Sequence, residues 1–295
     1  MKRGGPAVVA AVLTVAAVAG AASMPSAAAA SKLRVVASFY PLAYAAQRVG
    51  DGRVVVSNLT PAGAEPHDLE LTPDQIDAVL DADLMLELGH NFQPAVEKSA
   101  AQRDGPTLKM LDRLAAAKAH PNDPHVWLDP VLMQALVTQV ERGLTKADPV
   151  HRAVYARNAR ALRSELNALD VRYRDGLANC ARSLIVTAHE AFGYLARRYG
   201  LRQEGVAGLS PDDEPDPKRI AELTDLARRE HVTVVFAEEL VSPRIADTLA
   251  REAGVHTAVL NPLEGLTDQE RRAGANYVTV MDDNLRKLRT ALACK

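Results

Sequence analysis

The chain has 295 residues, with 35 basic against 37 acidic side chains, and nearly half of its residues are apolar. This length and composition are typical of a globular protein with one large or two ordinary domains. The near-neutral balance offers no basic surplus for nucleic acid and no polyacidic tail, so we expect no nucleic-acid partner.

The first thirty residues have the pattern of a secretory signal. Lys2 and Arg3 precede the apolar run "PAVVAAVLTVAAVAGAASM", and the small-residue segment "PSAAAAS" follows. A basic start, an apolar stretch and an Ala-x-Ala site predict a signal peptide over 1–30, cleaved near Ala30. An uncleaved membrane anchor is the alternative, because the run is borderline in length for a bilayer span. No cysteine lies near this site, so we expect a periplasmic or secreted protein without a lipid anchor.

The two cysteines, Cys180 and Cys294, are far apart in the sequence. An exported protein works in an oxidising compartment, where paired cysteines form disulfides. We therefore predict a Cys180–Cys294 disulfide that fastens the C-terminal helix to the second half of the chain. Two free thiols are the alternative.

The two halves of the chain repeat a pattern. The segment "LRVVASFYPLAYAAQRVGD" (33–51) is similar to "SLIVTAHEAFGYLARRYGL" (183–201), each a short β-branched run followed by a helical pattern. The segments 72–89 and 216–239 each open a helix with proline and lead into an apolar strand. Strands that alternate with helices predict parallel sheets with crossover helices. The fold class is therefore α/β, with two similar lobes.

A long helical pattern separates the two halves. Asp148 is the predicted N-cap and Pro149 the first helical residue. We assign 31–147 to the N-terminal lobe, 148–179 to an interlobe helix and 180–295 to the C-terminal lobe. The predicted apolar stripe of this helix consists of Val150, Val154, Ala161, Leu162, Leu166, Leu169 and Leu177.

Three histidines occupy loops at the ends of predicted strands. His67 lies in "PAGAEPHDLELTP", His125 in "NDPHVWLDP" and His189 in "LIVTAHEAFGYLA". In α/β sheets, functional residues gather beyond the carboxyl ends of the strands. Neutral imidazoles are the commonest protein ligands of zinc. In "AVLNPLEGLTDQE", Glu264 offers a carboxylate that would complete a closed tetrahedral site. Each residue alone is unremarkable, and the prediction rests on their joint placement.

These motifs give the chain a family resemblance. With "VVASFYPLAY", "FAEELVSP" and "NPLEGL" added, the chain resembles cluster A-I substrate-binding proteins of metal-importing ABC transporters, in the zinc-binding branch. The resemblance covers essentially the whole chain after the signal segment. It implies two α/β lobes joined by a backbone helix, with the metal ligands His67, His125, His189 and Glu264 in the cleft between the lobes.

The resemblance also implies function. The protein is expected to capture Zn²⁺ as a transported ligand and to deliver it to a membrane ABC permease with its ATPase, as a monomer and not as an enzyme. A zinc metallochaperone is a further expected partner. Manganese-type relatives use an aspartate from a "TDS"-like loop and often replace the third histidine by glutamate, and neither feature is present. Many zinc relatives carry a His-rich loop before the second ligand, whereas 90–124 holds only His90 and His120.

Three alternatives stay open. The first is a manganese-binding member of the same family. The second is a zinc metallohydrolase, which keeps one coordination position for water; four protein ligands and the lack of an HExxH motif argue against it. The third is an extracytoplasmic zinc-dependent adhesin or chaperone that works without a permease.

Several neighbours of the predicted ligands have expected supporting roles. Asp123 and Asp129 flank His125 and are candidates to orient it, since ligating histidines usually donate their other N–H to a carboxylate or carbonyl. Glu238 and Glu239 close the strand "VTVVFAEE" and are expected to be structural or to support the ligands.

Three further residues lie close to the predicted metal loops. Glu65, two residues before His67, is a candidate ligand, although a loop hydrogen bond is the expected role. Trp127 and Phe39 are expected to pack beneath the metal loops.

Overall fold

The computed structural model describes residues 1–2, 4–5, 7, 32–211 and 216–295. The predicted signal peptide, with its cleavage site near Ala30, lies mostly outside the described residues. The elements given below belong to Lys32–Lys295, which forms one unit. Within the described segments, no helix has both the length and the apolar character needed to cross a bilayer.

The first lobe is built on a parallel sheet with the strand order β2-β1-β3-β4. Strands β1 and β3 are central and largely buried, as expected for a parallel sheet covered by helices. Its elements are β1 (Leu33–Ala37), α1 (Tyr40–Gly50), β2 (Val54–Asn58), α2 (Pro73–Asp81), β3 (Leu84–Glu87), α3 (Pro94–Ala100), β4 (Thr107–Lys109), α4 (Ala115–Ala119) and α5 (Pro130–Ala147). Short 3-10 turns lie at Asp51–Arg53, Leu111–Arg113 and Val126–Leu128.

The second lobe repeats this topology, with the strand order β6-β5-β7-β8 and parallel pairing throughout. In each lobe the second strand lies beside the first, and the third and fourth follow on the other side. Its elements are β5 (Leu184–Thr187), α7 (Gly193–Tyr199), β6 (Arg202–Gly205), α8 (Pro217–Arg229), β7 (Val234–Ala237), α9 (Arg244–Ala253), β8 (His256–Val259), α10 (Asp268–Arg272) and α11 (Tyr277–Leu292). The prediction of two similar α/β lobes is confirmed.

Local sequence explains where the crossover helices begin. Helix α2 starts at Pro73, and Thr72 and Gln75 form a reciprocal capping box at its N-terminus. Helix α8 starts at Pro217, and the Asp216 side chain accepts a hydrogen bond from the Lys218 backbone N–H. Both helices therefore begin at the proline that the sequence pattern indicated.

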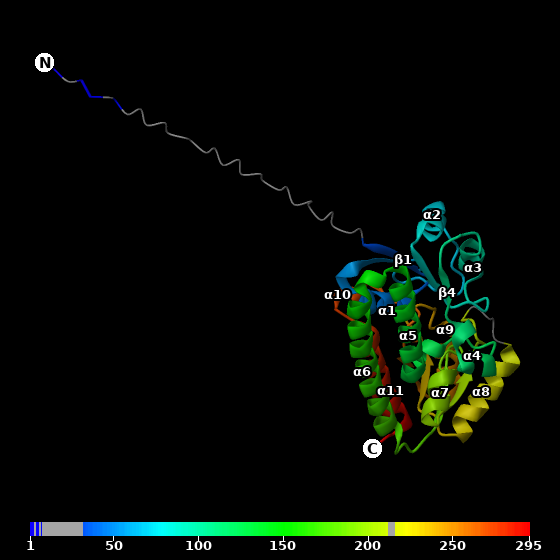
Figure 1. Cartoon of the computed structure of the whole chain (residues 1–295). Coiled ribbons are helices and arrows are strands. Elements are labelled where there is room, and N and C mark those ends of the chain that lie inside the picture. Colours follow the sequence, from blue (N-terminus) through cyan, green and yellow to red (C-terminus); the bar gives the residue numbers. More distant parts are fainter. Residues whose placement is uncertain (3, 6, 8–31, 212–215) are drawn as a thin grey trace. The chain divides into compact units, whose positions relative to one another are not determined.

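A long helix links the lobes. Helix α6 (Arg152–Leu177) follows the 3-10 turn Pro149–His151 and packs against α1 and α5 of the first lobe and against α7 and α11 of the second (Figure 1). Its buried face consists of Tyr155, Ala159, Leu162, Leu166, Leu169, Tyr173 and Leu177, together with Asp170. The predicted stripe was wrong at Val150, which is 86% exposed, and at Ala161, which is also exposed. Tyr155 and Tyr173, which the predicted stripe did not include, belong to the buried face.

Asp148 stands at the predicted N-cap position and Pro149 is the first residue of the 3-10 turn that leads into this helix. The Asp148 side chain makes no cap hydrogen bond to the backbone. Instead its carboxylate accepts hydrogen bonds from the Tyr155 hydroxyl at 2.6 Å and contacts the His151 ring Nδ1 at 2.6 Å. The 3-10 turn lies between Asp148 and the α-helix proper, which begins four residues after Asp148, at Arg152.

The two lobes share one hydrophobic core. The largest cluster of buried apolar residues includes Phe39 and Trp127 from the first lobe, Leu166 from α6, and Phe236 and Tyr277 from the second lobe. Apolar contact therefore runs without a break across the lobe boundary. Each fully buried leucine or phenylalanine contributes about 1.5–3 kcal/mol to stability.

The predicted disulfide is present. Cys180, just after α6, is bonded to Cys294, just after α11. Backbone hydrogen bonds from Lys295 N to Asn179 O and from Arg182 N to Leu292 O hold the same two segments together. In the chain-entropy model, a crosslink between residues 114 positions apart stabilises the fold by about 4–5 kcal/mol.

Truncating the buried face of α6 should lower stability strongly. Leu166→Ala removes a side chain with no exposed surface, so we expect the free energy of unfolding to fall by about 2–5 kcal/mol. The exposed Val150→Ala is the matched control, expected to change it by less than about 0.5 kcal/mol. Denaturant unfolding measures both, and equal losses in the two variants would contradict the assigned helix face.

Candidate metal centre

Four loops meet at the lobe boundary and bring the predicted ligand side chains together. His67 lies on the loop after β2, and His125 immediately precedes the 3-10 turn Val126–Leu128. His189 stands two residues after β5, and Glu264 lies on the loop after β8. Each lobe therefore supplies two of the four side chains.

The four side chains converge on one point. Their candidate ligand atoms all lie within 4.8 Å of one another. Glu264 Oε1 is 3.3 Å from the Nε2 atoms of both His67 and His125, and 3.4 Å from His189 Nε2. The Nε2 atoms of His125 and His189 are also 3.4 Å apart.

These separations match a small tetrahedral ion. Zinc bonds to imidazole nitrogen and carboxylate oxygen are about 2.0–2.2 Å long, so neighbouring ligand atoms in a tetrahedron lie roughly 3.3–3.6 Å apart. Four of the six separations between ligand atoms, 3.3–3.4 Å, fall in this range, and all six lie within 4.8 Å. The arrangement accommodates zinc with little movement of the side chains.

The centre is closed to solvent except at His67. The side chains of His125 and His189 have no exposed surface, and that of Glu264 has 1%, whereas 11% of His67 is exposed. His67 borders a cavity of about 170 Å³ that is also lined by His90, Phe92, Pro124 and Leu209. A cation from solvent therefore reaches the centre past His67.

Carboxylates orient two of the histidines. Asp123 Oδ1 lies 3.0 Å from His125 Nδ1 and accepts the His125 backbone N–H at 3.1 Å. Glu238 does the same for His189, with Oε2 at 2.7 Å from Nδ1 and Oε1 accepting the backbone N–H at 3.0 Å. Each carboxylate therefore directs the other ring nitrogen, Nε2, toward the centre.

The other two candidate carboxylates, Asp129 and Glu239, have different roles. Asp129 Oδ1 accepts the Val131 and Leu132 backbone N–H groups and caps α5, while Oδ2 accepts a hydrogen bond from Arg198. Glu239 is exposed. The sequence proposed both members of each pair as candidates, and the structure separates them.

Glu65 makes the expected loop hydrogen bond. Its Oε1 accepts the His67 backbone N–H at 3.1 Å and lies 4.0 Å from His67 Nε2. Burial and the nearby Glu264 carboxylate raise the pKa of Glu65 to about 9, so this carboxyl is neutral near pH 7.

Aromatic side chains support the centre from below, as predicted. Phe39 and Trp127 are fully buried and lie edge to face, with ring centroids 4.8 Å apart. Phe92 connects them to the site, since its ring lies 4.7 Å from that of His67. The Trp127 indole N–H donates to the Pro262 carbonyl at 2.8 Å and so ties the His125 loop to the loop of Glu264.

The Glu264 loop is fixed by asparagines. Leu263 has a left-handed backbone (φ 58°), and its N–H donates to Asn261 Oδ1 at 2.7 Å. Asn284 on α11 in turn pairs with both backbone groups of Asn261. Sequence reasoning missed Asn284, although the Asn-Pro step of the loop indicated the turn.

Charge coupling links the histidine and carboxylate side chains of this group. Burial lowers the pKa of His189, but the Glu238 and Glu264 carboxylates outweigh it and raise that pKa well above its usual value. Burial also lowers the pKa of His125, and Asp123 and Glu264 likewise raise it overall. The same histidines hold the pKa of Glu264 well below its usual value in spite of burial. A bound metal ion must therefore displace protons from His125 and His189.

Other histidines lie outside this group. His120 is exposed and its ring packs edge-on against Tyr194, with centroids 5.8 Å apart. His90 Nε2 pairs with Asp112 Oδ1 at 3.2 Å. His151 contacts Asp148, with Nδ1 at 2.6 Å from Oδ2.

Comparison with known proteins identifies relatives along nearly the whole chain. Residues 35–291 match the family described as "Zinc-uptake complex component A periplasmic". The high-affinity zinc uptake system protein ZnuA of Bacillus subtilis is 37% identical over 283 residues, which cover 90% of this chain and 89% of that protein. The zinc-binding lipoprotein AdcA of Streptococcus pneumoniae is 36% identical over 88% of this chain, which spans only 55% of AdcA.

Solved structures agree with these relatives. The crystal structure of the Zn(II)-bound ZnuA-like domain of S. pneumoniae AdcA matches 89% of this chain and 99% of that domain, with a TM-score of 0.78 and 36% identity. The metal-dependent lipoprotein YcdH from B. subtilis matches 88% of this chain and 99% of that structure, with a TM-score of 0.77 and 38% identity.

Fold and site together define an extracytoplasmic solute-binding protein and not an enzyme. The chain belongs to the ZnuA family, the periplasmic components of zinc-uptake complexes.

The stabilising effect of zinc should grow with pH. The raised pKa values of His125 and His189 stabilise the metal-free protein fully below the ordinary imidazole pKa of about 6.5, and this stabilisation is lost as pH rises through the raised values. Zinc needs the neutral imidazoles, so its affinity rises over the same interval. We expect the difference in Tm between zinc-loaded and metal-free protein to widen as pH rises above about 6.5. Calorimetric scans measure it, and a constant difference would contradict this coupling.

Glu238 should matter more than its neighbour Glu239. Glu238→Gln leaves only one oxygen for the two His189 donors, so we expect zinc affinity to fall by about 10–100-fold. Glu239→Gln changes an exposed side chain and serves as the matched control, with unchanged affinity. Competition with a chromophoric chelator measures both values. Equal affinities in the two variants would show that Glu238 does not orient His189.

Proposed function

We propose that this protein captures Zn²⁺ outside the cytoplasm with His67, His125, His189 and Glu264, and delivers it to an ABC permease with its ATPase. The observation that carries the proposal is the convergence of four ligand atoms within 4.8 Å of one another, with four of their six separations equal to the edges of a zinc tetrahedron. Membership in a family of zinc-uptake components supports the same conclusion.

The ligand set explains which competing ions are rejected. Three imidazole nitrogens and one carboxylate disfavour Ca²⁺ and Mg²⁺, which bind through oxygen ligands. Manganese also favours oxygen ligands and stands at the weak end of the divalent affinity series, so zinc is preferred. Rejection of copper cannot come from affinity, because that series favours copper over zinc.

The geometry supports binding and transfer more than catalysis. Catalytic zinc usually has three protein ligands and one position for water. Here Glu264 Oε1 lies within 3.4 Å of all three Nε2 atoms and takes the fourth position. The metallohydrolase alternative therefore requires that Glu264 leave the metal.

The proposal includes the chain's organisation and partners. Residues 1–30 act as an export signal without a lipid anchor, 31–147 and 180–295 form the lobes, and 148–179 joins them. The protein acts as a monomer, and a zinc metallochaperone is a possible donor or acceptor of the ion. The shared interlobe core and the length of α6 support these boundaries.

Zinc titration of wild type and of Glu264→Ala, with manganese as competitor, tests this function. We expect one tight site in the wild type that excess manganese does not displace. Losing a direct ligand should weaken zinc binding by more than the roughly 10–100-fold typical of outer-shell partners. Glu239→Ala, which removes an exposed carboxylate, is the matched control.

Two outcomes would overturn the proposal in different ways. If Glu264→Ala binds zinc as tightly as wild type, the fourth ligand is wrong and a site with bound water must be considered. If manganese readily displaces zinc, the metal assignment fails, although the fold and the cluster stand.

A further inference from the structure

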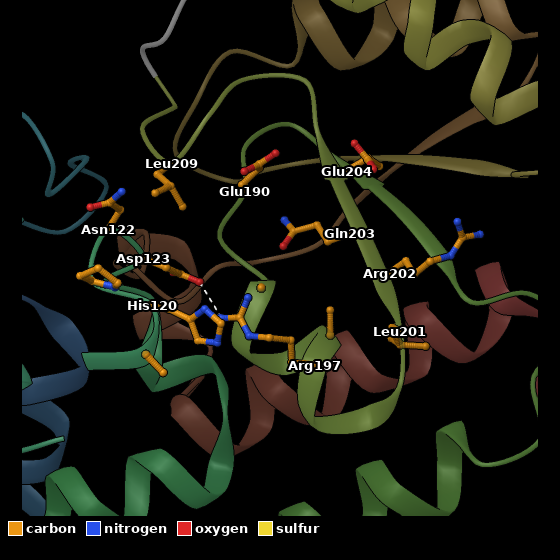
Figure 2. Close-up of a pocket in the computed structure, with 14 residues that line it drawn as sticks. His120, Asn122, Asp123, Glu190, Arg197, Leu201, Arg202, Gln203, Glu204 and Leu209 are labelled. Atoms are coloured by element: carbon orange, nitrogen blue, oxygen red, sulfur yellow. Dashed lines mark hydrogen bonds and ion pairs between the residues drawn. The ribbon is translucent and has the colours of Figure 1, made fainter. Parts of the chain in front are cut away.

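An open pocket of about 630 Å³ lies beside the metal centre. It is bounded by the loop around His120 and Asp123 of the first lobe and by Glu190, Arg197 and Gln203 of the second. Figure 2 shows Arg197 reaching from α7 to Asp123 along one wall of this pocket. The pocket thus exposes to solvent the far side of a carboxylate that contacts His125.

The two oxygens of Asp123 serve opposite lobes. Oδ1 faces His125 of its own loop, at 3.0 Å from Nδ1 and 3.1 Å from the backbone nitrogen. Oδ2 accepts a hydrogen bond from Arg197 Nη2 at 2.9 Å. A contact chain therefore runs from α7 of the second lobe through Asp123 to a ligand of the first lobe.

Tyr194 holds both ends of this contact in place. The Arg197 guanidinium lies over the Tyr194 ring, 4.5 Å from its centroid. The Tyr194 hydroxyl lies 3.3 Å from the carbonyl oxygens of both Ala116 and Asp123, on the opposite lobe. The direction of the guanidinium is thus fixed relative to the loop that it contacts.

Gly193 leaves the space in which the ion pair forms. A Cβ atom at this position would lie 2.8 Å from Asp123 Oδ2 and 3.1 Å from Arg197 Nη1. Both are closer than ordinary van der Waals contact, so any side chain here would push the carboxylate and the guanidinium apart. Glycine at the first position of α7 therefore allows the Asp123 carboxylate and the Arg197 guanidinium to come close to each other.

The next residue provides a natural comparison. Arg198 also crosses the lobe boundary and donates to Asp129 Oδ2 at 2.8 Å. Asp129 uses its other oxygen to cap α5, and among the described residues none of its hydrogen bonds involves a histidine. Two consecutive arginines thus hold the two aspartates that flank His125, but only Arg197 acts on an aspartate in contact with the ring.

We propose that Arg197 is a positioning residue of the metal centre, which holds Asp123 against His125 from the opposite lobe and thereby sets zinc affinity and slows zinc release. This inference rests on the proposed function. It goes further because it makes the orientation of His125, a ligand from the first lobe, depend on the position of the second lobe. Displacing α7 by a small amount would release Asp123 and loosen His125 without touching the ligand itself.

Arg197→Gln and Arg198→Gln, compared with wild type, test the inference. We expect Arg197→Gln to weaken zinc binding by about tenfold, the low end for outer-shell partners, and to speed zinc transfer to a chelator in proportion. Arg197→Lys, which keeps the charge, should restore part of the loss. Arg198→Gln should bind zinc like wild type, because it breaks a similar interlobe ion pair away from the ring. Gly193→Ala keeps both charges but crowds them apart, and should reproduce the Arg197→Gln effect.

Cobalt(II) bound in place of zinc gives a readout that a purely structural role would not change. Its visible absorption reports ligand geometry, so the spectrum should shift in Arg197→Gln and remain as in wild type for Arg198→Gln. If both arginine variants lose the same affinity and their spectra stay unaltered, the inference is overturned. The two arginines would then only hold the lobes together. Wild-type affinity in Arg197→Gln would overturn it as well. Failure of wild type itself to bind zinc would instead refute the proposed function.

Discussion

The structure depends on one carboxylate oxygen that contacts three histidines. Glu264 Oε1 is buried and lies 3.3–3.4 Å from three imidazole nitrogens. A carboxylate in such a place is tolerated only when it is compensated by opposite charge and hydrogen bonds. In the metal-free protein the raised pKa values of His125 and His189 supply that charge. A divalent cation supplies it when bound, so the same oxygen stabilises the site in both states.

This contact requires the lobes to be registered to within a fraction of an ångström. Several features share that task at different distances from the site. Trp127 hydrogen-bonds to Pro262, and the Gly63 N–H donates to the Leu266 carbonyl, so that loops carrying ligands are tied directly. Farther away, α6 and the shared apolar core fix the lobes as bodies. Precision near the metal thus comes from polar contacts, and stability from burial.

Sequence reasoning succeeded where the chain itself dictates the outcome. Strand and helix alternation predicted both sheets, and the placement of His67 and His189 after strands predicted their convergence. His125 joins them from a different position than predicted, because it follows α4 and not a strand. The strands' parallel direction leaves these loops at one edge, so the inference needs no side-chain detail. The Cys180–Cys294 pairing followed from the predicted export signal and from the presence of only two cysteines in the chain.

The errors and omissions arose where side-chain direction depends on tertiary packing. The Asp148 carboxylate pairs with the side chains of His151 and Tyr155, contacts that the sequence pattern does not indicate. Glu238 and Glu239 are neighbours in sequence but point to opposite sides of a strand end, a distinction set by the pleat. The arginines on α7 carry no local signal of their role, since their partners lie about seventy residues earlier. Such contacts follow only from the docking of the lobes.

The repeated strand order has a consequence for how the ion is held. In the proposed site each lobe presents a pair of donors, His67 with His125 and His189 with Glu264, and neither pair alone would be more than a weak bidentate chelator. Tight binding arises because the fold keeps the second pair at a high effective concentration beside the first. The ion therefore acts as a crosslink between two half-sites. A permease that separates the halves slightly can lower affinity steeply, without having to break all four bonds at once.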